Sequence, residues 1–414
     1  FDQPVSGKGK FNADAAHISN VLATLAMGGN EADIRGSFGA PGEKLLWRVD
    51  GKQLAAVRRD LYGTLVATGA VTGTMAAPRT SFEVDAKGLG WVPSARTGNL
   101  GAFHASGDAW LTAPAKNGAR FVELKAKGTA QQFNPAALGS PMAGSINGSF
   151  DADGRLGPDW RGALNLALQP STLGSSPLTG YAKIVADARH VSNADVDLRL
   201  GPNVVNAKGS FGAGSDVLNW RVDAPQLDAL GPDFAGVLRG SGTVSGTMET
   251  PAVNAALEGQ NLRLLGKHQI RSIKASANLG NGRGAADPLV SDIAVTGYVS
   301  GDTRVDTATL KTSGTRGAHA LRFAARNADF DAAGDVQGGW SDGTWSGTVA
   351  ALQNKGRYAF ALQGPVPLRI AGAPGSGVMG LMSPTEVALR DAVIKLPNGT
   401  VSLQTLDKKG TRWT

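Results

Sequence analysis

The side chains that most often do chemistry are sparse and scattered in this chain. Its five histidines stand far apart in the sequence, at His17, His104, His190, His268 and His319. His17 and His190 occupy matching positions in two similar stretches, which favours a repeated structural role at a turn over metal ligation. The chain has no cysteine, so a thiolate metal site is excluded. The sequence therefore predicts no metal site and no cofactor.

Sequence motifs that are typical of enzymes do not indicate an active site either. The chain has no phosphate-binding G-x-x-x-x-G-K-[ST] loop and no H-E-x-x-H pair. Asp50 and Asp223 each follow a tryptophan by three residues, but they belong to separate similar stretches, and acid–base catalysis needs both groups at one substrate. Each precedes a loop, where aspartate commonly bonds its own backbone. We expect no catalytic residues and no enzymatic activity.

The most informative feature is an internal repeat. Residues 13–78 align with residues 186–251 at a constant shift of 173 without a gap, and about half of the positions are identical. The matches include GSFGA, WRVD and V-x-G-T-M-x-x-P. Repetition of this kind is typical of an extended array in which each unit covers its neighbour. We predict one continuous repetitive β array over residues 1–414, with related units at approximately 6–90 and 179–263.

Apolar and polar residues alternate along most of the chain, which predicts short β-strands with one buried and one exposed face. Glycine and proline punctuate these segments every eight to twelve residues or so, and such short connections indicate antiparallel neighbours. Asn398 and Gly399 suggest a hairpin with a type I′ turn. Residues 53–61 and 226–230 have the pattern of one or two helical turns. The fold class is all-β, with a mostly antiparallel sheet.

Composition excludes other classes. The net charge is +7, but the basic residues are scattered singly and no aromatic-rich binding box accompanies them, so we expect no nucleic-acid partner. No stretch has the roughly 20 apolar residues of a membrane-spanning helix, and residues 1–11 lack the pattern of a signal peptide. We interpret the chain as a fragment of a longer protein whose anchor lies outside it.

The repeated stretches resemble the periplasmic part of the TamB family, a group of AsmA-like, bridge-type lipid transport proteins. The similar segments are 36–78, 209–251, 305–323, 345–370 and 392–413. The resemblance implies an elongated sheet curled into a taco-like trough with an apolar interior. It further implies location in the periplasm of a Gram-negative bacterium, with the full-length protein anchored in the inner membrane. The implied outer-membrane partner is a TamA-like barrel of the Omp85 type.

The resemblance implies passive transport of phospholipids between the two membranes, with acyl chains in an apolar groove. The alternative is a scaffold or chaperone surface for the assembly of outer-membrane proteins. Trp47 and Trp220 fit either a trough lining or the ordinary core of a sandwich. The predicted groove-lining residues are Leu45, Trp47, Val49, Leu65, Val71, Leu164, Leu166, Leu168, Val196, Leu198, Leu200, Leu218, Trp220, Val222, Leu238, Val244, Phe360 and Leu362.

Overall fold

The computed structural model describes residues 3–91, 100–112, 120–138, 140, 142–157, 159–371, 385–409 and 412–413. These residues form 27 strands, and helix is confined to the single turn α1 (Leu54–Val57) and the 3-10 turns η2 (Pro135–Leu138) and η3 (Leu227–Leu230). The predicted all-β, antiparallel class is confirmed. The chain falls into two compact units, unit 1 (Phe1–Lys208 with Ala229–Gly231) and unit 2 (Gly209–Asp228 with Pro232–Thr414).

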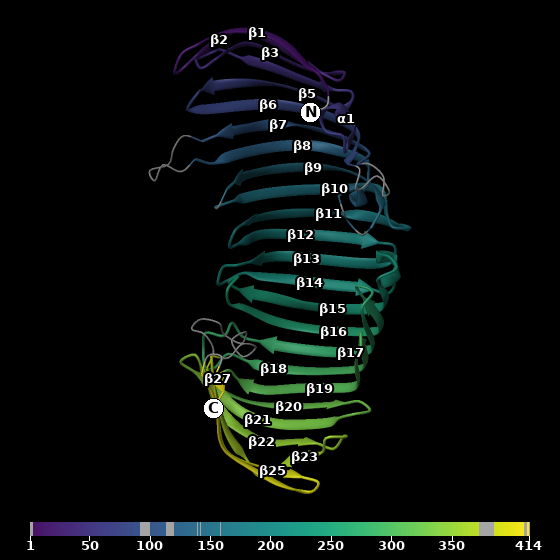
Figure 1. Ribbon diagram of the computed structural model, residues 1–414, viewed down its shortest axis with the longest axis vertical. Coiled ribbons are helices and arrows are strands. Elements are labelled where there is room, and N and C mark those ends of the chain that lie inside the picture. Colours follow the sequence, from purple (N-terminus) through teal and green to yellow (C-terminus); the bar gives the residue numbers. More distant parts are fainter. Residues whose placement is uncertain are drawn as a thin grey trace. The chain divides into compact units, whose positions relative to one another are not determined.

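In unit 1, every strand from β1 to β12 pairs antiparallel with the next strand in the sequence, so the strands follow one another like rungs (Figure 1). The bounds are β1 (Val5–Ala13), β2 (Ile18–Met27), β3 (Asn30–Phe38), β4 (Leu45–Gly51), β5 (Leu61–Thr74), β6 (Ala77–Trp91), β7 (Ala102–Leu111), β8 (Val122–Phe133), β9 (Gly144–Leu156), β10 (Arg161–Leu173), β11 (Ser176–Asp187) and β12 (Val191–Leu200). Strand β13 (Asn203–Phe211) contains the boundary between the units.

Unit 2 continues the same antiparallel order, except that β22 pairs with both β23 and β24, and both of these pair with β25. The bounds are β14 (Val217–Ala224), β15 (Ala235–Gly246), β16 (Pro251–Leu264), β17 (His268–Leu279), β18 (Leu289–Ser300), β19 (Thr303–Thr315), β20 (Ala318–Arg326), β21 (Asp331–Ser341), β22 (Thr344–Asn354), β23 (Phe360–Leu362), β24 (Val366–Ala371), β25 (Glu386–Leu396), β26 (Gly399–Lys409) and β27 (Arg412–Trp413).

The 173-residue repeat is also a repeat of structure. Strands β2 to β6 correspond to β12 to β16 within one or two residues at each end, and α1 corresponds to η3. The backbone follows the same path in detail: Gly39 and Gly212 have φ of 126° and 127°, and Gly63 and Gly236 have φ of 97° and 96°. Only glycine adopts such angles without strain. The shared glycines therefore preserve the local backbone geometry in both copies.

Turns of the two copies are held by the same bonds. The backbone N–H of Asp14 donates to the carbonyl of His17 (2.9 Å), and that of Asp187 donates to the carbonyl of His190 (2.8 Å). Glu43 Oε2 accepts from the N–H of Ala40 (3.0 Å); in the second copy the carboxylate of Asp216 accepts from the N–H of Ala213 (2.8 Å). Both equivalent histidines lie at this turn and accept its hydrogen bond through their backbone carbonyls.

The turn predicted near the end of the chain is present with a different centre. Leu396 pairs with Gly399, so the two connecting residues are Pro397 and Asn398, and Gly399 already belongs to β26. Neither Asn398 nor Gly399 has a positive φ, and proline fixes φ near −65°. The hairpin is confirmed, but the predicted type I′ geometry is wrong, because the turn is centred on Pro397 and Asn398 instead of Asn398 and Gly399.

Candidate functional site

The strands of unit 1 from β3 to β12 contribute to one apolar face. Directly opposite residues of antiparallel strands point to the same side of the sheet. Following the register from strand to strand gives this central row: Ile34, Trp47, Gly69, Phe82, Gly107, Ala126, Ala152, Leu164, Ile184 and Ala194. Every member is apolar or glycine. We call this side of β3–β12 the apolar face of unit 1.

The structure brings the predicted lining residues of unit 1 onto this one face. Leu45 and Val49 lie on either side of Trp47, opposite Val71 and Ala67, and Leu65 follows on the same side of β5. The register places the remaining predicted residues there too: Leu164, Leu166 and Leu168 on β10, and Val196, Leu198 and Leu200 on β12.

Unit 2 has an apolar face of its own. Leu218, Trp220 and Val222 lie opposite Val244, Gly242 and Gly240, with Leu238 next on the same side. From there the row runs through Leu257, Ala275, Ile293, Leu310, Phe323, Gly334 and Leu352. Two residues beyond Leu352, Asn354 pairs with Phe360, and Leu362 lies opposite Ile394, so the last two predicted residues also lie on this face.

Several large side chains on the apolar faces keep part of their surface open, whereas Trp340 and Trp345 of unit 2 are buried. Leu164 is 39% exposed and Ile34 is 40% exposed, while Trp47 and Trp220 are half-buried. Among the residues that the structure describes, more than half of the buried apolar ones are alanines. In the interior of a closed sandwich, side chains of this size would be almost fully removed from water. The sandwich-core interpretation of the two tryptophans therefore has little support.

Aromatic rings on these faces lie flat over glycine. A Cβ on Gly69 of β5 would stand 2.5 Å from the ring of Trp47 on β4, and the indole N–H of Trp47 donates across that strand to Thr80 on β6 (3.3 Å). Trp345 on β22 repeats the arrangement, with its ring over Gly338 and its N–H donating to His319 Nε2 on β20 (2.9 Å). Rings in this position add apolar area without projecting from the sheet.

The opposite side of each sheet carries charges in cross-strand pairs. Lys125 contacts Asp153 (3.1 Å) in unit 1, and Lys274 contacts Glu258 (3.0 Å) in unit 2. Asp50 and Asp223, the two aspartates that follow the repeated tryptophans, belong to this polar face. Asp50 lies 3.4 Å from the guanidinium of Arg48, and Asp223 lies 3.0 Å from that of Arg239. They form ion pairs instead of bonds to their own backbone. Such exposed pairs contribute little stability, but they keep the polar face of the sheet hydrated.

A G-x-S-x-G pattern at residues 339–343, resembling a nucleophile elbow, is a hairpin turn. Ser341 pairs with Thr344 across the turn between β21 and β22, and its hydroxyl donates to Asp342 (3.0 Å). A nucleophile elbow joins a strand to a helix. The serine therefore lies in an ordinary strand connection.

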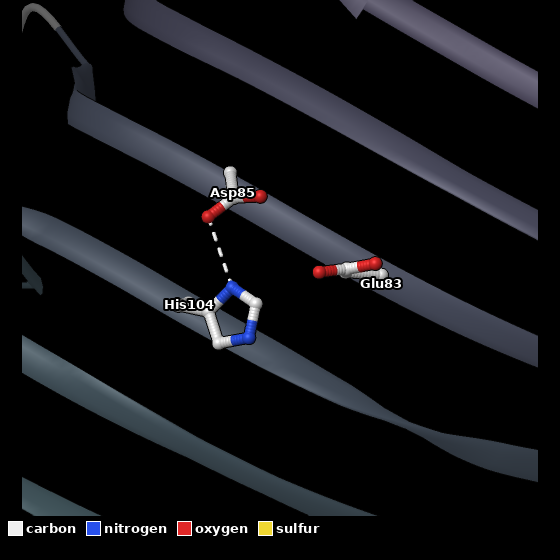
Figure 2. Close-up of side chains that lie close together, drawn as sticks. All are labelled: Glu83, Asp85 and His104. Carbon is white, nitrogen blue, oxygen red and sulfur yellow. Dashed lines mark hydrogen bonds and ion pairs between the residues drawn. The ribbon is translucent and has the colours of Figure 1, made fainter.

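Glu83, Asp85 and His104 form a cluster that the sequence pattern did not reveal. Asp85 on β6 lies directly opposite His104 on β7, and its Oδ1 is 2.9 Å from His104 Nδ1 (Figure 2). One ligand atom from each residue lies within 4.8 Å of the other two. Glu83 and Asp85 alternate on one strand, a visible signal, but only the register brings the distant histidine beside them.

These features define a repetitive all-β protein with an amphipathic sheet in each unit. The family described as "TamB, N-terminal domain" matches residues 119–374, more than half of the chain. The chain therefore belongs to the TamB family, a family of cell-envelope translocation and assembly modules. No solved structure matches the chain. No helix among the described residues is long and apolar enough to cross a membrane.

Proposed function

We propose that this chain is a segment of a periplasm-spanning conduit through which phospholipids pass between the inner and outer membranes. The observation that carries the proposal is the register. It brings the predicted lining residues of each unit onto one apolar face, on which large side chains such as Leu164 and Trp220 remain partly open. An apolar surface of this extent is costly in water and indicates a partner that covers it.

Acyl chains fit this face better than a folded protein partner does. The rows consist of leucine, isoleucine, valine, alanine and glycine, with aromatic rings lying flat, as at Trp47 over Gly69. Such a surface has few projections that could fix one shape of ligand. Charged headgroups would remain in water, since burying a charge without a partner is unfavourable.

Movement along such a face needs no catalysis by the chain. An acyl chain that leaves a bilayer for an equally apolar wall exchanges one apolar environment for another, so the free-energy change per step is close to zero. Neighbouring rungs offer the same kind of surface, so a lipid meets no deep minimum. The conduit is therefore passive, and any energy source acts elsewhere.

The full-length protein is proposed to be anchored in the inner membrane and to meet an Omp85-type barrel at the outer membrane. The alternative function is a surface for assembling outer-membrane proteins with that barrel. Extended polypeptides would then be the cargo, held by hydrogen bonds at a sheet edge. The two functions differ in what the purified chain should carry.

Mass spectrometry of solvent extracts tests the proposal. The purified chain should carry phospholipid in stoichiometric amounts. Trp220→Glu, on the apolar face of β14, should reduce the load several-fold, and Leu198→Asp should act likewise on β12. The matched control is Asn219→Glu, which adds the same charge one residue away on the polar face. Absence of lipid together with binding of extended peptides would overturn the conduit in favour of the assembly surface.

A further inference from the structure

The Glu83, Asp85 and His104 cluster differs from the ion pairs with lysine or arginine elsewhere on the polar face. Some acidic side chains there face a lysine or arginine across the strands, as in Lys311 with Asp292 and Arg322 with Asp335. Here two carboxylates share one histidine. No ion pair joins Glu83 to a cation within the described residues, and its cross-strand neighbours are the neutral Thr68 and Ser106.

The second copy of the repeat shows the ordinary arrangement at the same place. Asp85 corresponds to Glu258 on β16, and the residue opposite Glu258 is Lys274, with which it forms an ion pair (3.0 Å). Glu83 corresponds to Ala256. The first copy thus has imidazole in place of the ammonium group and a carboxylate in place of a methyl group. One difference replaces the cation of the ion pair and the other adds a second carboxylate beside it, and both introduce groups that ligate metals.

We propose that Glu83, Asp85 and His104 form a binding site for a divalent transition metal of the zinc class. One imidazole nitrogen and two carboxylate oxygens suit Zn²⁺, which binds such atoms at about 2.0–2.2 Å. Tetrahedral ligands at that length stand about 3.3 Å apart. The three ligand atoms, all within 4.8 Å of one another, reach this spacing by small rotations. Asp85 and His104 have exposed side chains that are free to make them.

The site is open to solvent, which leaves a fourth position for water. His104 also borders a hollow of about 500 Å³ on the polar face, together with Ser106, Lys127 and Thr129. A metal ion can therefore enter without opening the sheet. Bound there, it would join β6 to β7 through side chains as well as through the backbone ladder. Magnesium is a poor fit, because it prefers oxygen ligands in octahedral geometry.

Calorimetric titration of the whole chain, without a histidine tag and after treatment with a chelator, tests the site. ZnCl₂ should bind with one equivalent that MgCl₂ does not displace. His104→Ala and Glu83→Gln should each weaken zinc binding at least tenfold. The matched control is Glu258→Gln, which removes the carboxylate of the equivalent ordinary pair and should leave zinc binding unchanged.

Two further readouts separate ligation from a structural effect. Zinc should raise the midpoint of thermal unfolding of the wild type but not of His104→Ala, because a ligand that binds only the folded state stabilises it. X-ray absorption at the zinc edge should show one imidazole and oxygen donors. The proposal is overturned if the wild type takes up no zinc, or if His104→Ala binds it as tightly as the wild type.

Discussion

Replacing Gly69 by alanine tests whether the flat tryptophan depends on the glycine beneath it. The new Cβ would stand 2.2 Å from the carbonyl oxygen of Ser81 and 2.5 Å from two ring carbons of Trp47. Carbon and oxygen atoms normally approach no closer than about 3.3 Å, so both the ring and the backbone of β6 must move by about 1 Å. Overpacking of this kind costs about 1–3 kcal/mol.

A smaller effect acts in the opposite direction. Alanine restricts the unfolded chain and stabilises the folded state by about 0.4–1 kcal/mol where the backbone permits it. The net expectation for Gly69→Ala is a loss of about 1–2 kcal/mol. For a unit of roughly 200 residues, this lowers the midpoint of thermal unfolding by about 3–6 °C. Scanning calorimetry or circular dichroism measures it.

A control substitution at Gly214 and a double variant that lacks the Trp47 ring test whether the loss of stability in Gly69→Ala comes from the contact with that ring. Gly214 lies in a loop where an added Cβ meets nothing within 4 Å, so Gly214→Ala should be neutral or slightly stabilising. In the Trp47→Ala background, Gly69→Ala should cost less, because the ring is gone and only the contact with Ser81 remains. If Gly69→Ala melts at or above the temperature of Gly214→Ala, our account of the aromatic rings on the apolar face is incorrect.

Two other substitutions test the repeat turn and the buried tryptophan of unit 2. The hydrogen bond from His17 lowers the pKa of Glu43 below its usual value, so the folded state gains stability from this carboxylate above its unfolded pKa and loses it as pH falls through the lower folded pKa. The difference in melting temperature between the wild type and Glu43→Gln should therefore become smaller as pH falls below about 4.5. A difference in melting temperature that stays constant with pH would contradict this. Trp345→Phe removes the bond to His319 Nε2 at a side chain that is only 5% exposed and should cost about 1–3 kcal/mol in the free energy of unfolding. Tyr358→Phe, at a 74% exposed position, is its control, and equal stability of the two variants would exclude a contribution from the bond.

The side of the sheet on which many residues lie follows from the sequence, because side chains alternate with a period of two. Leu45, Trp47 and Val49 were assigned to one face from spacing alone, and the register places them there. The repeat extended this assignment to Leu218, Trp220 and Val222. Local periodicity determines the side of a strand on which a residue lies, so these predictions needed no long-range information.

Contacts between strands could not be predicted, because local periodicity does not determine which residues of neighbouring strands lie opposite each other. Asp85 and His104 lie opposite each other only because β6 and β7 pair in one particular register. The seating of Trp47 over Gly69 likewise depends on which glycine of β5 falls opposite the ring. Alternation gives the side of the sheet, whereas the partner across the gap depends on turn lengths and bulges such as that between Tyr62 and Thr64.

Pairing of each strand in unit 1 with only its immediate neighbours has a consequence for how such chains change in evolution. Removal or insertion of two adjacent strands would leave every other pairing intact and would return the next strand to its original direction. Genes of this kind can therefore gain or lose hairpins without redesigning the remainder. The number of strands in the sheet can then change by two at a time.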